Sequence, residues 1–272
     1  MLSTMQTIFD VGMHVGKDTQ FYLDKGFRVI AIEARPDFIA KNRCKFKPYL
    51  DSGLLEIIPC AVAKAEGVMP FYVFPEKDDW GTLDTDYAQR NIKFGKKYYI
   101  IEVPTLPFSS VLERYGIPYY LKIDIEGADI LCVEALHQFP NRPKYLSLET
   151  HLTNFEQAFG ALAHLFALGY RRFKIVNQGM NQLRRCPKPP LEGNYVDARF
   201  DGEMSGPFGE EAPGVWRGAE ETLAALRRIA RTQALFSPGG SLHGWVWAYN
   251  RLSLRLGREP MGWYDLHAAL EA

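Results

Sequence analysis

The alternation of strand-like and helix-like segments is the feature that most constrains the fold of this chain. Short apolar runs alternate with amphipathic stretches from Thr7 to Val176. This pattern is typical of βαβ units, in which parallel strands are connected by helices that pack on the sheet. The sequence therefore predicts a mostly parallel sheet, with strands at residues 7–11, 28–34, 54–63, 119–127, 145–151 and 171–178.

Two parts of the chain depart from this alternation. Residues 76–97 are polar and aromatic without a clear period, so we expect an irregular excursion. Residues 179–238 are rich in proline, glycine and charge, and end in a helix with acidic residues first and arginines last, which matches the helix dipole. We predict one domain over residues 1–272, in which 179–238 forms a cap over the substrate. "GWVWAY" and "WYDLHAAL" are late strand or helix candidates.

Composition excludes several classes of protein. The chain has 272 residues, 47% of them hydrophobic, with 32 basic and 32 acidic residues. A net charge of zero gives no reason to expect nucleic acid or an acidic membrane surface as a partner. The 4 cysteines form no CxxC pair, so neither a zinc site nor a disulfide framework is indicated. With no signal-peptide pattern and no apolar run of membrane-spanning length, we expect a cytoplasmic protein.

The first strand leads into a glycine turn, "TIFDVGMHVGKDTQ". In open parallel sheets, ligands bind beyond the carboxyl ends of the strands. Gly12 lets the backbone approach a ligand closely, and Gly16 opens a helix whose free amides can meet an anion. Dinucleotide sites prefer a third glycine, and Asp10 would repel a pyrophosphate. An amino group and a sulfonium would instead be attracted, which favours S-adenosylmethionine over NAD.

Two further positions complete the expected cofactor site. Glu33 ends the second strand, 21 residues after Gly12, where an acid can accept hydrogen bonds from both ribose hydroxyls. Ala61, within Cys60–Val62, closes the third strand and is the expected neighbour of the adenine.

The fourth and fifth strands also end in polar residues, and these are the candidates for catalysis. Asp124 and Glu126 in "KIDIEG" should share one strand face, and so should Glu149 and His151 in "LETH". Two versions of the chemistry stay open. In one, His151 is a general base oriented by Glu149. In the other, Asp124, Glu149 and His151 hold Mg²⁺ or another divalent ion that lowers the pKa of an acceptor hydroxyl.

Five segments together resemble the FkbM-type S-adenosylmethionine-dependent methyltransferases over roughly Thr7 to Val176. They are "FDVGMHVGKDT", "IAIEARP", "IPCAVA", "YYLKIDIEGADILCVEAL" and "YLSLETH". The chain departs from the family at Asp129, where a glutamate is frequent. The resemblance implies a Rossmann-like seven-stranded class I methyltransferase sheet with helices on both faces.

The resemblance also implies a function and a site. The function is O-methylation of a small hydroxylated acceptor, often a sugar or a secondary metabolite. It places Gly12 and Gly16 at the methionine end of the cofactor, Glu33 at the ribose and Asp124 near the reacting end. Together with Asp10, Thr19 and Ala61, these are the cofactor-binding residues that we expect. We expect no nucleic acid and no membrane among the partners. The rival hypotheses are an NAD-dependent oxidoreductase and a non-catalytic module that keeps the fold for binding.

Overall fold

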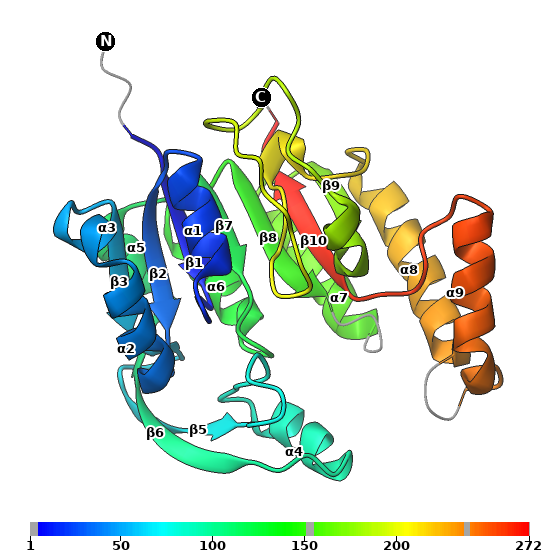
Figure 1. Cartoon of the computed structure of the whole chain (residues 1–272), viewed down its shortest axis with the longest axis horizontal. Coiled ribbons are helices and arrows are strands. Elements are labelled where there is room, and N and C mark those ends of the chain that lie inside the picture. Colours follow the sequence, from blue (N-terminus) through cyan, green and yellow to red (C-terminus); the bar gives the residue numbers. More distant parts are fainter. Residues whose placement is uncertain (1–4, 151–154, 237–239, 272) are drawn as a thin grey trace. The chain divides into compact units, whose positions relative to one another are not determined.

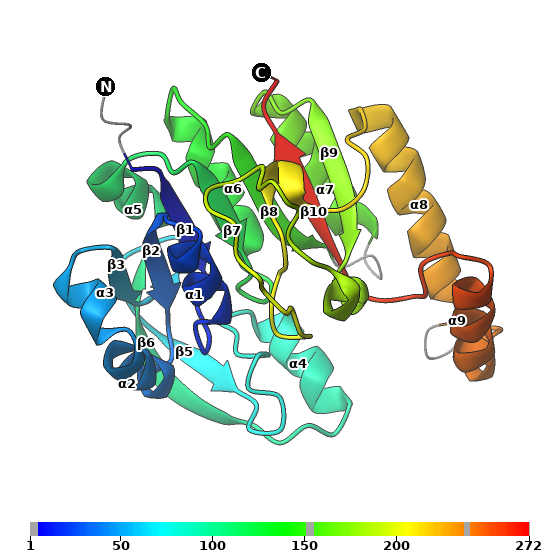
Figure 2. The same cartoon turned by 45° about the horizontal axis from the view of Figure 1, so that its top comes forward.

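The computed structural model of this chain describes residues 5–150, 155–236 and 240–271. Its strands form a seven-stranded sheet in the order β3-β2-β1-β7-β8-β10-β9 and a three-stranded sheet in the order β4-β6-β5 (Figures 1 and 2). Strands β3, β2, β1 and β7 are parallel, whereas β10 is antiparallel to β9. The predicted mostly parallel sheet is therefore confirmed. The chain divides into two compact units, residues 1–146 with 193–196, and residues 147–192 with 197–272.

The first unit is built from parallel strands and their connecting helices. The strands of the large sheet are β1 (Thr7–Val11), β2 (Arg28–Glu33), β3 (Leu55–Pro59) and β7 (Tyr120–Ile123). The helices are α1 (Lys17–Asp24), α2 (Pro36–Lys45), α3 (Lys47–Asp51), α4 (Thr85–Lys93), α5 (Phe108–Tyr115), α6 (Asp129–Ala135) and the 3₁₀ turn η1 (Leu136–Gln138).

Helices pack on both faces of the sheet in this unit. Phe9 of β1 meets Phe108 of α5 edge to face, with ring centroids 6.4 Å apart. The other face of the sheet carries Tyr120 of β7, whose ring lies 5.8 Å from Tyr22 of α1. Because side chains alternate along a strand, Phe9 and the neighbouring Ile8, which pairs with Tyr120, point to opposite faces.

The three-stranded sheet was not predicted. It consists of β4 (Ala61–Val62), β5 (Gly67–Val73) and β6 (Tyr99–Leu106). The third strand was expected over residues 54–63 with an interruption at Pro59, but its two pieces belong to different sheets, because the chain leaves the large sheet after Pro59 and pairs with β6 from Ala61 onward. Proline has no amide hydrogen to continue a ladder, which is consistent with the break at this point.

The expected irregular excursion at residues 76–97 is also wrong in part, because α4 lies within it. The Asp84 carboxylate accepts hydrogen bonds from the amides of Asp86 and Tyr87, which caps the first turn. Tyr87, Ala88 and Asn91 form the buried face of the helix. This cap and this spacing were readable in the sequence, but the surrounding charged residues obscured them.

The second unit contains β8 (Tyr145–Thr150) from Ser147 onward, together with the paired strands β9 (Arg172–Asn177) and β10 (Tyr264–Ala269). Its helices are α7 (Phe155–Ala167), α8 (Ala219–Phe236) and α9 (Val246–Arg255), and its 3₁₀ turns are η2 (Gln178–Leu183), η3 (Gly209–Glu211) and η4 (His243–Trp245). Of the two late candidates, "WYDLHAAL" contains strand β10, and "GWVWAY" leads into helix α9.

Helix α8 lies inside the predicted cap, yet it packs against α7 and β9 and so covers the sheet of its own unit. Phe200 and Phe208 of the same segment are buried, which makes them packing residues. Among the helices of the described residues, α8 included, none is both long and apolar enough to cross a bilayer. The cap over the acceptor stays a prediction. Because α8 packs on the sheet, residues 179–218 are the part of the segment that could form such a cap.

One side chain ties the three-stranded region to the loop after β7. The Thr82 hydroxyl donates to the Glu126 carbonyl at 2.6 Å and accepts from the Asp84 amide at 2.8 Å. Its side chain is completely buried. We expect Thr82→Val to lower the free energy of unfolding by about 1–3 kcal/mol, because two buried partners lose their hydrogen bond.

Urea unfolding followed by circular dichroism measures this loss. The control is Thr85→Val, the same exchange at the exposed first residue of α4. If both variants unfold at the same urea concentration, the Thr82 hydroxyl does not stabilise the loop.

Candidate active site

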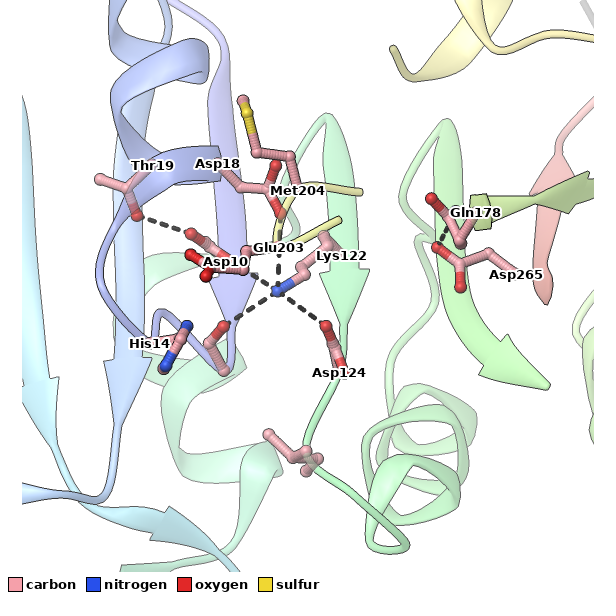
Figure 3. A network of polar contacts seen from close by, with 12 residues as sticks. Asp10, His14, Asp18, Thr19, Lys122, Asp124, Gln178, Glu203, Met204 and Asp265 are labelled. Atoms are coloured by element: carbon pink, nitrogen blue, oxygen red, sulfur yellow. Dashed lines mark hydrogen bonds and ion pairs between the residues drawn. The ribbon is translucent and has the colours of Figure 1, made fainter. Parts of the chain in front are cut away.

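Three parallel strands of the first unit end side by side, and the candidate residues follow them. Val11 at the end of β1 is in register with Ile32 on one side and Ile123 on the other. Gly12, Glu33 and Asp124 therefore lie at one edge of the sheet, as the sequence predicts. Figure 3 shows the polar side chains that gather there.

The glycine turn is packed too closely for any side chain. Gly12 has φ +92°, and a Cβ on it would lie 1.9 Å from the Asp124 carbonyl oxygen. Gly16 has φ +74°, and a Cβ on it would lie 2.6 Å from the Phe46 ring. Gly16 also occupies the N-cap of α1, where no side chain caps the helix. The backbone of β1, the turn and the end of β7 are thus in direct contact, with first-turn amides of α1 available to an anion.

A buried lysine that sequence analysis missed joins these elements (Figure 3). The Lys122 Nζ donates to the Gly12 carbonyl at 2.9 Å and pairs with the Asp10 carboxylate at 3.2 Å. It lies 3.5 Å from Asp124 and 3.9 Å from Asp18. Burial alone lowers the pKa of Lys122, but attraction to Asp10, Asp124 and Asp18 outweighs it and raises the pKa well above its usual range. One positive charge thus faces three carboxylates.

Asp10 itself faces the protein. Its side chain is completely buried, pairs with Lys122 and accepts a 2.6 Å hydrogen bond from the Thr19 hydroxyl, which is buried too. Of the three carboxylates around the lysine, only Asp124 is substantially exposed, at 45% of its side chain. The sequence did contain a signal for this cluster. The apolar run "YYLKIDI" includes one lysine, and the apolar run "IFDV" includes one acid.

Glu33 is held by the backbone on both sides. Its carboxylate accepts the His14 amide at 2.7 Å and the Arg35 amide at 2.8 Å. Burial raises the pKa of Glu33 to about 7, although these amides and the Arg35 charge act in the opposite direction. The Ala34 amide also lowers the pKa of this carboxylate through a hydrogen bond. A carboxylate has about four acceptor positions, so these three amides leave room for another donor.

His14 acts through its backbone in this turn. It has φ +51°, its amide donates to Glu33, and its carbonyl accepts the Asn42 side-chain amide at 2.6 Å. Its ring stands edge-on against Phe38, with centroids 4.6 Å apart, and its Nε2 lies 3.6 Å from the Asp78 carboxylate. The main contribution of this histidine is to hold the loop against Glu33.

The "KIDIEG" segment is a strand only as far as Ile123. The expectation that Asp124 and Glu126 share a strand face is therefore wrong. Glu126 has φ +51° and Gly127 has φ +103°, and the Asp129 carboxylate accepts hydrogen bonds from the amides of Ile125 and Gly127. Burial, followed by the charge of Asp124, raises the pKa of Glu126 well above its usual range and that of Asp129 to about 6.

Three more predicted residues lie on other elements of the chain. Ala61 is buried in the core of the small sheet with Phe71, Val73 and Val103. Glu149 lies near the end of β8, in the second unit. His151 falls outside the described residues. The contacts predicted for these three residues with a cofactor, an acceptor or a metal stay predictions.

Sequence analysis also missed a polar group at the carboxyl end of β9. The Gln178 side-chain amide donates to the Asp265 carboxylate of β10 at 2.5 Å (Figure 3). Asn181 donates to Gln178, and the Arg184 guanidinium donates to Asn181. These residues belong to the edge of the second unit where β9 ends and β10 begins.

A mostly parallel α/β sheet with a glycine turn after β1 and acids after its neighbours is typical of Rossmann-like proteins that bind nucleotide cofactors. The family described as "Methyltransferase FkbM domain" matches residues 10–172, more than half of the chain. The protein belongs to the FkbM methyltransferase family.

Several solved structures are similar to this chain. The methyltransferase FkbM from Methylobacillus flagellatus KT is 15% identical with a TM-score of 0.35, and the match covers 53% of this chain but only 32% of that one. A SAM dependent methyltransferase from Archaeoglobus fulgidus is 10% identical with a TM-score of 0.40, over 98% and 87% of the two chains. The precorrin-6y C5,15-methyltransferase from Geobacter metallireducens GS-15 is 11% identical with a TM-score of 0.37, over 65% and 69%. A search of curated proteins gave no match.

Replacing the buried lysine should destabilise the whole glycine turn. We expect Lys122→Met to lower the free energy of unfolding by about 3–5 kcal/mol, because Asp10 is left buried without an opposite charge. Adding Asp10→Asn should restore much of this loss, since the uncompensated charge is removed. Urea unfolding of the two variants and the parent measures both effects.

The control is Lys45→Met. This exposed lysine contacts the same turn from outside, through the Val15 carbonyl, so its loss should cost about 0.5 kcal/mol or less. A Lys122→Met variant as stable as Lys45→Met would contradict a structural role for the buried pair.

Proposed function

We propose that this protein is an S-adenosylmethionine-dependent methyltransferase that acts on a hydroxyl of a small molecule, such as a sugar or a secondary metabolite. The observation that carries the proposal is the excess of carboxylates around Lys122, where Asp10, Asp18 and Asp124 surround one buried ammonium group. A negative potential there favours a cationic ligand and disfavours a pyrophosphate. When bound, S-adenosylmethionine supplies a methyl group on a positively charged sulfur.

Each candidate cofactor residue has a role in this proposal. Gly12 and Gly16 let the turn pack directly against Asp124 and Phe46. In the proposal this turn borders the ligand, and the uncapped amides of α1 receive its carboxylate. Asp124 is the exposed acid that attracts its amino group. Asp10 and Thr19 are both buried, so in this proposal they hold Lys122 and the turn in place from the protein interior. Glu33 accepts the ribose hydroxyls, and Ala61 is proposed as a neighbour of the adenine.

The acceptor hydroxyl must lose a proton as its oxygen bonds to the methyl carbon. In the version we favour, His151 takes that proton and Glu149 orients its ring, since an imidazole titrates near neutral pH. The alternative is a divalent ion held by Asp124, Glu149 and His151. In either version, most of the acceleration would come from aligning the oxygen behind the methyl group.

The first test is binding. Calorimetry should detect S-adenosylhomocysteine, the product form of the cofactor, but not NADH. Binding of NADH alone would point to an oxidoreductase, and binding of neither would favour a non-catalytic module. A screen of hydroxylated acceptors with S-adenosylmethionine, read by product mass, then tests O-methylation itself.

A second test separates the two proton acceptors. With an acceptor in hand, we expect His151→Ala to lower kcat at least about 100-fold, the usual scale of general base catalysis. The exposed His137 provides the control variant His137→Ala, which should keep parental turnover. Exhaustive chelation should leave activity intact. Loss of activity on chelation, regained with Mg²⁺, would favour the metal version.

The raised pKa of Glu33 predicts that cofactor binding depends on pH. Its pKa of about 7 means that the carboxylate, which accepts hydroxyl protons, predominates only above neutral pH. Affinity for S-adenosylhomocysteine should therefore fall roughly tenfold from pH 8 to pH 6, as the ionised fraction falls from about 0.9 to about 0.09. Calorimetry across this range measures the slope.

The variant Glu33→Gln should bind more weakly at pH 8 and lose this part of the slope, because an amide does not titrate. Any slope that remains belongs to the ligand or to other groups. The exposed Glu66 gives the control Glu66→Gln, which should follow the parent. A parental slope in Glu33→Gln would exclude Glu33 as the titrating group.

A further inference from the structure

The loop that leads into α4 and the loop that follows β7 are both rich in acidic residues. Residues 76–86 contain five acids and one lysine, and residues 124–129 contain three acids and no basic residue. Both loops belong to the first unit. In both views α4, β5 and β6 lie beyond the arrowhead of β2, on the side of the sheet where the candidate site lies (Figures 1 and 2). Negative charge therefore extends from the glycine turn toward α4.

Three of these acids already serve the chain itself. Asp84 caps the first turn of α4 by accepting two backbone amides, and Asp129 accepts two amides of its own loop. The Glu76 carboxylate pairs with the Lys96 ammonium group at 3.4 Å. These contacts account for the presence of Asp84, Asp129 and Glu76 without any ligand.

Glu126 is different, because the contacts of its carboxyl group are incomplete. Its backbone has φ +51°, in the left-handed region that a residue other than glycine seldom adopts. The Tyr87 hydroxyl donates a hydrogen bond to its carboxyl group. The Oε2 atom is buried and has no hydrogen-bond partner among the described residues. A buried carboxylate oxygen without a donor costs stability, so a donor from a ligand would be favourable at this position.

The charges around Glu126 decide which donor suits it. Those that act on it most strongly belong to Asp124, Asp129 and Asp79, and together with burial they raise the pKa of Glu126 well above its usual range. A neutral hydroxyl would supply a hydrogen bond but leave these negative charges uncompensated. A protonated amine supplies N–H donors and the opposite charge together, and such charge-assisted hydrogen bonds are roughly twice as strong as neutral ones.

The surroundings of Glu126 point to the acceptor and not to the cofactor. Asp124 follows β7 directly beside the glycine turn, where we propose that it attracts the amino group of the cofactor. The neighbours of Glu126 lie on the other side, since Tyr87 belongs to α4 and Thr82 bonds the Glu126 carbonyl from the loop before it. Asp79 is exposed on that same loop. An amine bound there would belong to a second ligand.

We propose that the acceptor carries a protonated amine, as amino sugars do, and that Glu126 and Asp79 bind this ammonium group. The inference rests on the proposed methyltransferase function and narrows its class of acceptor. Tyr87 is a positioning residue in this site, because its hydroxyl orients the Glu126 carboxyl group. Acceptors with a phosphate or a carboxylate in the same place would be repelled by the surrounding acids.

The experiment is calorimetry of the protein loaded with S-adenosylhomocysteine. It is titrated with glucosamine, galactosamine and mannosamine, and with the N-acetyl form of each. N-acetylation removes the positive charge and leaves the ring hydroxyls in place. We expect at least one amine to bind at least about tenfold more tightly than its N-acetyl form, because a hydrogen bond to a charged group is lost. High salt should reduce this preference.

Binding of S-adenosylhomocysteine is measured first, so that two failures can be told apart. A protein that does not bind it contradicts the proposed function. A protein that binds it but prefers none of the three amines over the N-acetyl forms contradicts this inference alone.

Variants then assign the preference to single side chains. Glu126→Gln keeps the shape of the side chain and removes its charge, so it should lower the affinity for the amine at least about tenfold. Its affinity for S-adenosylhomocysteine should stay within about twofold of the parent. Asp79→Asn should cause a smaller loss, because this acid is exposed. The matched control is Asp86→Asn, which removes an exposed acid from the first turn of α4 and should bind the amine as the parent does.

Tyr87→Phe tests positioning, since it should reduce the preference for the amine over its N-acetyl form, which a loss of stability alone would not change. Circular dichroism verifies that every variant is folded. A loss of S-adenosylhomocysteine affinity in Glu126→Gln as large as its loss of amine affinity would assign the carboxyl group to the cofactor and overturn the proposal. So would calorimetric binding of Mg²⁺ that Glu126→Gln abolishes, because the acids would then form a metal site.

Discussion

The ion pair between Asp10 and Lys122 is the interaction on which the candidate site depends. Strand register places these residues opposite each other on β1 and β7, and both side chains are buried. The same ammonium donates to the Gly12 carbonyl, so the charge pair and the glycine turn form one unit. A buried ion pair seldom stabilises a folded protein more than two well-packed apolar side chains of similar volume would. Its effect here is to fix the turn and to leave the edge of the sheet with more negative than positive charge.

Backbone hydrogen bonds hold the three loops at this edge before any ligand arrives. Glu33 accepts two amides from the loops that start at β1 and β2, Asp129 accepts two amides from the loop after β7, and Thr82 connects that loop to the small sheet. Such preorganisation is what a site for a large cofactor needs, because less conformational entropy is then lost on binding.

Strands and turns were predictable where local chemistry decides them. Apolar runs predicted β1, β2, β8 and β9 closely, and the glycines predicted the turn after β1. The sequence could not show that residues 54–63 contribute to two different sheets. That division depends on the pairing of β4 with β6, which is a contact between segments far apart in the chain. The end of β7 was misplaced for a similar reason, since the hydrogen bonds of Asp129 and not the residue pattern stop the strand.

The sequence by itself determined the βαβ order, the glycine turn and the positions of Glu33 and Asp124 at strand ends, because these depend on periodicity and on residues that tolerate only certain backbone angles. Only the tertiary structure decided that Asp10 is turned inward onto Lys122. This depends on which side chains are excluded from water, and burial is a property of contacts between elements that no local pattern specifies.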